Sequence, residues 1–249
     1  MGRVHIRAFL FAFTLLAGPL LFSSIASARS GYYAQQGLYV TGSGTYTNLE
    51  GGLDGHAVYQ YDYSPFTALV IAKPSSAFGW GAGAGYRFSF YAIEINYYQS
   101  RHNDSYYDYI FDGSGNLLTG PGNSQSTLET LSLDFKLYAN ARKQLQPYIL
   151  GGVGYSWLYQ RDRVIYPVTG NTRFANFGPN VGAGIAYYIT PKLALDAGFI
   201  CRYLHFTTVK AYGGSENELG QSIDENAFTA RAGVSYTFDL GNSKNTRAF

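Results

Sequence analysis

One set of side chains in this sequence has the types and spacing that covalent chemistry requires. His205 and Thr207 stand two positions apart, and Glu225 follows them at the start of a later segment. A histidine that activates a hydroxyl nucleophile, with an acid nearby, is the arrangement of acyl-transfer enzymes. No further motif accompanies these residues, so a histidine at the junction of a strand and a loop is the simpler interpretation.

Metal and phosphate sites are not expected. The segment 112–116 begins like a calcium-binding loop, but Leu117 and Asn123 stand where an EF-hand needs glycine and glutamate. We therefore expect a glycine-rich turn between two strand arms, 106–111 and 117–118. The sequence has no phosphate-binding glycine loop and no cluster of cysteine and histidine for zinc, so it predicts neither a cofactor nor a metal.

A second group of residues that could do chemistry is charged and lies among small or apolar neighbours. The group consists of Arg87, Glu94, Asp134, Lys136, Asp196, Arg202 and Arg231. Four of these residues are basic and three are acidic, so their charges nearly cancel. They could line an ion path or seal an interior with ion pairs, depending on the elements that carry them.

These charges lie in segments whose apolar residues recur at every second position, which is the periodicity of β-strands. Eight such segments fall near 37–46, 77–88, 91–100, 127–138, 146–157, 175–188, 192–204 and 227–238. One face is bulky and apolar, as at Leu131, Leu133 and Phe135. The opposite face is small, polar or charged, as at Ser132 and Asp134.

The glycines of 77–88 decide which face points outward. A water-soluble barrel would bury the bulky face and need a polar exterior, which Gly79, Gly81, Gly83 and Gly85 cannot supply. In a small membrane barrel, bulky residues face lipid while small and charged ones fill a narrow lumen. The sheet must close because lipid offers the backbone no hydrogen-bond partner. The predicted fold is therefore all-β, an eight-stranded antiparallel up-and-down transmembrane β-barrel.

Composition agrees with this fold class. Charged residues make up 14% of the 249 residues and aromatic residues 17%, whereas soluble domains carry about 25% charged residues. A disordered chain would be richer in charge and poorer in aromatic residues. One cysteine cannot form a disulfide within the chain, which excludes a disulfide scaffold.

The N-terminal residues read as a secretory signal peptide over 1–28. Arg3 and Arg7 precede an apolar stretch, 8–25, and Ala26-Ser27-Ala28 provides the small residues of a cleavage site. A membrane-anchoring helix is the alternative, although Gly18-Pro19 interrupts a stretch that is barely long enough to span about 30 Å. Cleavage would leave 29–249 as one barrel domain with its strands within 37–238.

Removal of the signal peptide also neutralises the chain. Residues 1–28 contain two arginines and no acid, so the 18 basic residues become 16 and equal the 16 acidic ones. This balance gives no reason to expect nucleic-acid binding.

The connections predict the orientation of the barrel. They are short at 89–90, 139–145 and 189–191, and long at 47–76, 101–126, 158–174 and 205–226. Short periplasmic turns that alternate with long extracellular loops are typical of outer-membrane barrels. Three basic residues of one long loop, Arg161, Arg163 and Arg173, are candidates for contact with lipopolysaccharide phosphates.

A weak internal repeat carries a family resemblance. Small residues alternate and lead to an aromatic one in 83–88, 152–155, 182–187 and 232–238. With Pro147-Tyr148, this pattern resembles the eight-stranded outer-membrane barrels of OmpA-like and OmpX-like domains and of opacity-type surface proteins. The resemblance implies a Gram-negative outer-membrane location and insertion by the barrel-assembly machinery. It also implies that Tyr236 and Phe238 form the assembly signal, although Phe249 could serve instead.

The resemblance bears on function as well. His205, Thr207 and Glu225 faintly resemble the His, Ser and acid of outer-membrane lipid A deacylases, with Thr207 in place of the serine. Eight strands leave interior space only for side chains, which favours a sealed polar plug over an ion path. We therefore expect a non-enzymatic monomer in outer-membrane lipid, with a structural or adhesive role and an unknown surface ligand. A narrow porin and a lipid A hydrolase are the alternatives.

Overall fold

The computed structural model describes residues 33–59, 68–111, 114–162, 170–210 and 217–238. The predicted signal peptide, Arg163 and Phe249 lie outside these residues. Within the described residues, no helix is long and apolar enough to span a membrane.

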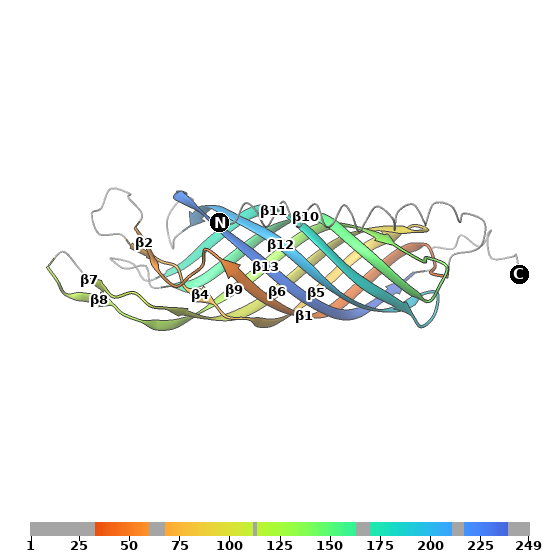
Figure 1. Ribbon diagram of the computed structural model, residues 1–249, viewed down its shortest axis with the longest axis horizontal. Helices are drawn as coiled ribbons and strands as arrows, with labels where there is room; N and C mark the ends of the chain where they lie inside the picture. Colours follow the sequence, from red (N-terminus) through yellow and green to blue (C-terminus); the bar gives the residue numbers. More distant parts are fainter. Residues whose placement is uncertain (1–32, 60–67, 112–113, 163–169, 211–216, 239–249) are drawn as a thin grey trace, which may run out of the picture.

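Eight long strands form a closed antiparallel barrel, which confirms the predicted fold class. They are β1 (Gly37–Gly51), β5 (Ala77–Arg87), β6 (Tyr91–Tyr106), β9 (Gly122–Tyr138), β10 (Leu145–Asp162), β11 (Gly170–Tyr188), β12 (Leu193–Lys210) and β13 (Asn217–Thr237). Each strand pairs with the next along the chain, and β1 pairs with β13 to close the sheet. The strands are strongly tilted against the long axis (Figure 1).

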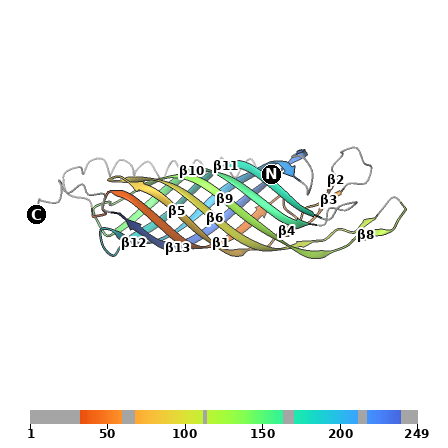
Figure 2. The same cartoon turned by 180° about the vertical axis from the view of Figure 1, so that it is seen from behind.

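Five short strands lie at the end opposite the short turns. The strands β2 (Ala57–Tyr59) and β3 (Ala68–Val70) pair with each other, and β4 (Lys73–Pro74) pairs with β6. The hairpin of β7 (Ile110–Phe111) and β8 (Leu117–Thr119) extends beyond the barrel in both views (Figures 1 and 2). In its turn, Gly115 has a φ of 82°, a conformation that favours glycine.

Side chains that point away from the lumen form an apolar belt around the barrel. Phe78 is 81% exposed, Ile95 is 58% exposed and Leu133 is 50% exposed. Ser132, the neighbour of Leu133 on the other face, is buried. An apolar exterior around a polar interior is the arrangement of a membrane barrel, as the sequence predicted.

Aromatic rings gather at both edges of this belt. Near the short turns, the rings of Phe88 and Tyr91 stack with centroids 4.3 Å apart. Toward the long loops, the rings of Trp80 and Tyr97 lie 5.5 Å apart. Such rings mark the two interfaces between lipid and water.

Glycines on the inner face of β5 make room for side chains of the neighbouring strand. A Cβ atom on Gly83 would lie 2.1 Å from Oδ1 of Asn96, and one on Gly85 would lie 2.9 Å from Cγ of Glu94. Both separations are shorter than normal van der Waals contacts. The glycines that the sequence shows at every second position of β5 are therefore needed to pack a narrow lumen.

The strands extend beyond the predicted segments on the side of the long loops, which corrects the expected loop bounds. β6 continues to Tyr106, β10 to Asp162 and β12 to Lys210. Beyond the lipid, the outward face of a strand no longer has to be apolar, so the pattern of outward apolar residues that located the segments ends there. The backbone ladder nevertheless continues, as in the pairing of Asn103 with Gln125.

Candidate functional site

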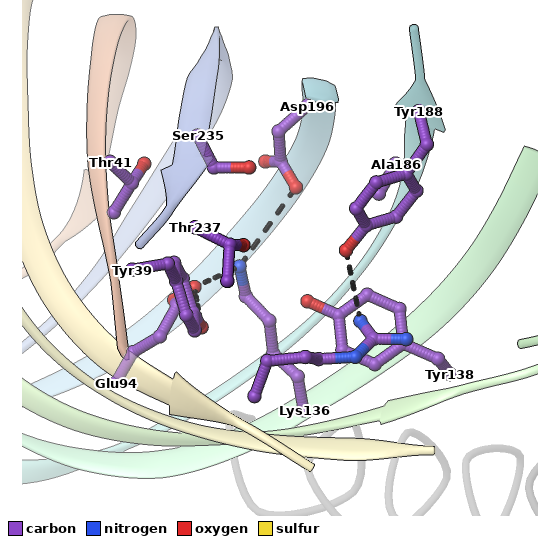
Figure 3. Close-up of a pocket in the computed structure, with 11 residues that line it drawn as sticks. Tyr39, Thr41, Glu94, Lys136, Tyr138, Ala186, Tyr188, Asp196, Ser235 and Thr237 are labelled. Carbon is purple, nitrogen blue, oxygen red and sulfur yellow. Dashed lines mark hydrogen bonds and ion pairs between the residues drawn. The ribbon is translucent and has the colours of Figure 1, made fainter. Parts of the chain in front are cut away.

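The candidate site is the barrel interior, where four of the predicted charges form ion pairs. Lys136 Nζ lies 2.6 Å from Glu94 Oε1 and 3.9 Å from Asp196 Oδ2. Arg231 Nη2 lies 3.0 Å from Asp196 Oδ1. Figure 3 shows Lys136 between the two carboxylates. These side chains come from β6, β9, β12 and β13, so the cluster bridges opposite walls of the barrel.

Inward-facing tyrosines complete the bonding of this cluster. The Tyr39 hydroxyl donates to Glu94 at 2.5 Å, and the Tyr148 hydroxyl donates to Asp196 at 3.0 Å. Arg231 donates to the hydroxyls of Tyr98 and Tyr148 at 2.8 and 3.0 Å. A buried ion pair is stable only when its remaining donors and acceptors are also satisfied, and the tyrosines meet most of this requirement.

Three predicted members of the ion-pair network are held differently, which corrects that part of the expectation. In the described part of the chain, no ion pair involves Arg87, Arg202 or Asp134. The Asp134 carboxylate instead accepts hydrogen bonds from Ser132, Asn96 and Asn180. Because neutral side chains supply these bonds, the charge does not need an opposite charge beside it.

The two arginines lie against aromatic rings. The Arg87 guanidinium lies 3.4 Å from the centre of the Tyr138 ring and donates to Gln146 at 2.6 Å. Arg202 lies 4.3 Å from the centre of the Tyr98 ring and donates to Thr229. Cation–π contact stabilises a desolvated guanidinium without a carboxylate. Inward-facing site residues were predicted from their charge, and these tyrosines were therefore missed. The alternation of residues along each strand, which places the tyrosines on the inner face, could have identified them.

The space left within the ion-paired cluster is very small. A cavity of about 10 Å³ lies among Tyr39, Glu94, Lys136 and Asp196 (Figure 3). That volume is close to the minimum for one water molecule. A hydrated ion therefore does not fit into this cavity.

Further toward the long loops, the interior becomes apolar, which corrects the expectation of a wholly polar lumen. Along the inner face of β9, Lys136, Asp134, Ser132 and Thr130 lead to the buried Leu128. The apolar layer consists of Leu49, Leu53, Ile71, Leu128, Leu158, Phe174, Leu204, Phe206, Ile223 and Ala227. Its two phenylalanine rings lie 5.7 Å apart.

Described residues of the connection between β1 and β5 pack into the extracellular end of the barrel, where Leu53, Ile71 and Ala72 are buried. Side chains of the barrel wall bind the main chain of this connection. Glu225 accepts a hydrogen bond from the Leu53 amide at 3.0 Å, and Gln160 donates one to the Ala72 carbonyl at 2.9 Å. His102 Nδ1 donates to the Ser75 carbonyl at 2.6 Å. Burial raises the pKa of the Glu225 carboxyl to about 7 and lowers the pKa of His102.

The structure does not assemble the acyl-transfer set. The His205 imidazole pairs with the Asp224 carboxylate and points outward, as does the exposed Thr207. Glu225 points into the barrel, where it binds the Leu53 amide. His205 pairs across the ladder with Asp224, the residue before Glu225. Because successive residues of a strand face opposite sides, Glu225 faces away from His205 and cannot orient it.

The remaining predicted site residues that the structure describes lie at the two ends of the barrel. Tyr236 and Phe238 face outward at the end of β13, with ring centroids 5.4 Å apart. Arg161 is exposed on β10, and Arg173 on β11 lies beside Lys210 of β12.

The whole architecture agrees with one known family. The family described as "Outer membrane protein beta-barrel domain" has a model that matches residues 14–238. The chain belongs to this outer-membrane β-barrel family. Family membership and the apolar belt place it in the Gram-negative outer membrane.

Solved structures support the fold. OprG from Pseudomonas aeruginosa is 14% identical with a TM-score of 0.53, and the match covers 84% of this chain and 98% of OprG. Neisserial surface protein A is 15% identical with a TM-score of 0.51, over 81% of this chain and 97% of that protein. AlkL, solved in lipid bilayers, is 16% identical with a TM-score of 0.50, over 86% and 95%. No curated protein matches the chain.

Proposed function

We propose that this barrel is a closed, non-enzymatic outer-membrane protein with a structural and surface-interaction role carried by its extracellular loops. The observation that supports the proposal is the filling of the lumen by two unlike layers. The ion-paired cluster leaves about 10 Å³, and the apolar layer with its loop lies above it. Hydrated ions would have to displace both layers.

The non-enzymatic part of the proposal rests on the orientation of the one candidate set. His205 and Glu225 face opposite sides of the wall, and His205 pairs with Asp224 instead. Lipid A hydrolysis would need a nucleophile activated by this histidine. Incubation of the purified barrel with lipid A tests this directly. We expect no released acyl chain, whereas release that is lost in His205→Ala would contradict the proposal.

Conductance in planar bilayers tests closure. The wild-type monomer should show no steady single-channel steps, because a bare ion entering the cluster would lose its hydration. A monodisperse monomer, verified before reconstitution, is the required material. Steady steps from such a monomer would make the narrow porin the better function.

Export and assembly form a separate part of the proposal. We expect the mature chain to begin at Arg29, which intact mass of the purified protein measures. Phe238→Ala should lower the amount of folded barrel in the outer membrane if the assembly machinery recognises the end of β13. Phe249→Ala is the matched variant, and loss of assembly in that variant alone would move the signal to the C-terminal residue.

The basic residues Arg161, Arg163 and Arg173 are proposed to contact lipopolysaccharide phosphates. Arg173 pairs with Lys210 in the β11–β12 ladder, at the extracellular end of the barrel. Arginine suits phosphate because its fork can donate two hydrogen bonds. Arg173→Ala should weaken binding to phosphorylated lipopolysaccharide and leave binding to the dephosphorylated form unchanged.

A further inference from the structure

The outer wall of β6, β9 and β10 changes from apolar to polar at the extracellular edge of the apolar belt. One row of the ladder joins Trp80, Gln99, Glu129 and Trp157 across β5, β6, β9 and β10. The next two outward-facing rows on the extracellular side consist of polar residues and one tyrosine. We call these two rows the basic face, and its residues are Arg101, Asn103, Gln125, Thr127, Tyr159 and Arg161.

The basic face contains two arginines, whose positions follow from the register of the strands. Arg101 of β6 pairs with Thr127 of β9, and Tyr159 of β10 pairs with the same threonine from the other side. Arg161 follows Tyr159 by two positions, so it lies on the same side of the sheet. Adjacent strands lie about 4.8 Å apart and rise about 3.4 Å per residue, which places the Cα atoms of the two arginines about 12 Å apart.

Both guanidinium groups are available to an anion. Arg101 and Arg161 are exposed, and in the part of the chain that the structure describes neither forms an ion pair. The acids near them on β6 and β9 do not neutralise this face. Asp104 is 2% exposed and lies on the inner side of β6, and Glu129 lies in the row of the aromatic rings, where it accepts a hydrogen bond from Gln99 at 3.0 Å.

The extracellular row of the basic face borders a depression of about 770 Å³. Asn103, Gln125 and Arg161 all line this depression. Asn103 and Gln125 pair with each other in the ladder, so two amides lie on the same outward row. Amides donate and accept hydrogen bonds, as sugar hydroxyls do, whereas a guanidinium suits phosphate. This combination of groups favours a saccharide that carries phosphate.

The opposite part of the outer wall has the opposite charge. At the extracellular ends of β1 and β13, the exposed charged side chains include Glu50 and Asp224. Glu50 accepts a hydrogen bond from Asn48 at 2.7 Å, and Asp224 pairs with His205. A phosphorylated headgroup would be repelled by these carboxylates unless a divalent cation bridged the charges, whereas the basic face attracts it directly.

We propose that the basic face binds the phosphorylated saccharide headgroup of lipopolysaccharide in the surrounding leaflet. Arg101 and Arg161 each donate to one phosphate, and Gln125 contacts the sugar between them. Aromatic rings mark the interface of lipid and water, so the rows beyond them lie at the level of the headgroups. The disaccharide of lipid A carries a phosphate at each end, which two separated cations can hold. The inference rests on the lipopolysaccharide contact proposed above for Arg161, and it adds Arg101 and the part of the lipid that is bound.

Native mass spectrometry of the mature chain in detergent micelles measures the binding. The probes are a short-core lipopolysaccharide, the same lipid after phosphatase treatment, and the phosphorylated saccharide left after deacylation. We expect the phosphorylated lipid to bind, and the dephosphorylated lipid to bind at least about ten-fold more weakly. Binding of the deacylated saccharide as tightly as the lipid would overturn the assignment to a membrane lipid.

Single substitutions test the two contacts separately. Arg101→Gln and Arg161→Gln should each weaken binding of the phosphorylated lipid about ten-fold, the effect of losing one charged hydrogen bond, and leave the dephosphorylated lipid unaffected. Gln125→Ala should weaken binding of both forms by the same factor. Lys143→Gln removes an exposed charge at the periplasmic end and should change neither. Equal melting temperatures of the variants show that the fold is retained.

Unchanged binding in Arg101→Gln would overturn the inference, as would a wild type that binds both forms of the lipid equally. Loss of binding in EDTA and in Glu50→Gln would place a cation-bridged contact on the opposite wall instead. Binding that falls in Arg173→Ala but not in Arg101→Gln or Arg161→Gln would refute the basic face and leave the lipopolysaccharide contact at β11 and β12. Steady channel steps from the wild type, with lipid binding intact, would refute the closed barrel and leave the basic face standing.

Discussion

The two halves of the barrel interior contain opposite kinds of chemistry. The periplasmic half contains the ion pairs of Lys136 with Glu94 and of Arg231 with Asp196, surrounded by tyrosine hydroxyls. The extracellular half contains leucine and phenylalanine side chains beneath a loop held by its main chain. The first layer is bonded in specific directions, whereas the second is held by non-directional packing. We therefore expect the first layer to be destabilised by the loss of a bonding partner and the second by the loss of side-chain volume.

The largest expected effect comes from breaking the ion-paired layer at its centre. Lys136→Met leaves Glu94 buried without its cation, and removing one partner of a buried pair costs about 3–5 kcal/mol. Chemical unfolding in micelles measures this loss. Adding Glu94→Gln to Lys136→Met should restore much of the lost free energy of unfolding, because the uncompensated charge of Glu94 is then removed. A single variant as stable as wild type would show that the pair is solvated.

The apolar layer should respond to lost volume. Leu158 is fully buried and pairs in register with Phe174, so Leu158→Ala should lower the unfolding free energy by about 2–5 kcal/mol. Leu158→Met keeps the volume and should cost much less. If the two variants were equally stable, the layer would not be close-packed.

Tyr98 separates two roles within the periplasmic half. Its hydroxyl accepts from Arg231 at 2.8 Å, and its ring lies 4.3 Å from the Arg202 guanidinium. Tyr98→Phe removes only the hydroxyl and should cost about 1–3 kcal/mol by leaving a buried donor unpaired. Tyr98→Leu also removes the ring and should cost more. Identical losses would mean that the ring contributes nothing to holding Arg202.

The smallest effect concerns the pH dependence of the extracellular half. Burial raises the pKa of Glu225 from 4.5 to about 7, so the folded state holds this proton more tightly than the unfolded state. The stability due to this group is therefore greatest below the unfolded pKa and falls as pH rises from about 4.5 to about 7. His102, whose pKa is lowered, contributes in the opposite direction on acidification.

Glu225→Gln isolates that contribution, because the amide oxygen can still accept from Leu53. Melting temperatures at about pH 5 and about pH 8 should differ less in this variant than in the wild type, with the wild type losing more at the higher pH. A variant with the same or a steeper fall than the wild type would show that Glu225 does not titrate in this range.

The periplasmic half was more predictable from sequence than the extracellular half. The alternation of bulky apolar residues with small or polar ones places Glu94 on the inner face of β6, and Asp134 and Lys136 on the inner face of β9. In a closed barrel, both of these faces line the lumen. Which charges pair depends on side-chain reach across the lumen, so Arg87 and Arg202 were wrongly assigned to ion pairs. The apolar layer was missed because the alternation of apolar residues reverses there: Leu128 faces inward while Glu129 faces outward. Contacts of the loop main chain with Glu225 and Gln160 leave no periodic signal in the sequence.

We propose that each layer closes the barrel by itself, and the conductance of layer-specific variants tests this proposal. Lys136→Ala with Arg231→Ala disrupts the ion-paired layer, and Phe174→Ala with Phe206→Ala disrupts the apolar layer. With folding verified by circular dichroism, either pair alone should remain silent in planar bilayers, and the four substitutions together should produce steady single-channel steps. Steady single-channel steps from the wild type would contradict closure by two independent layers. So would steps from either double variant with the same conductance as the variant that carries all four substitutions.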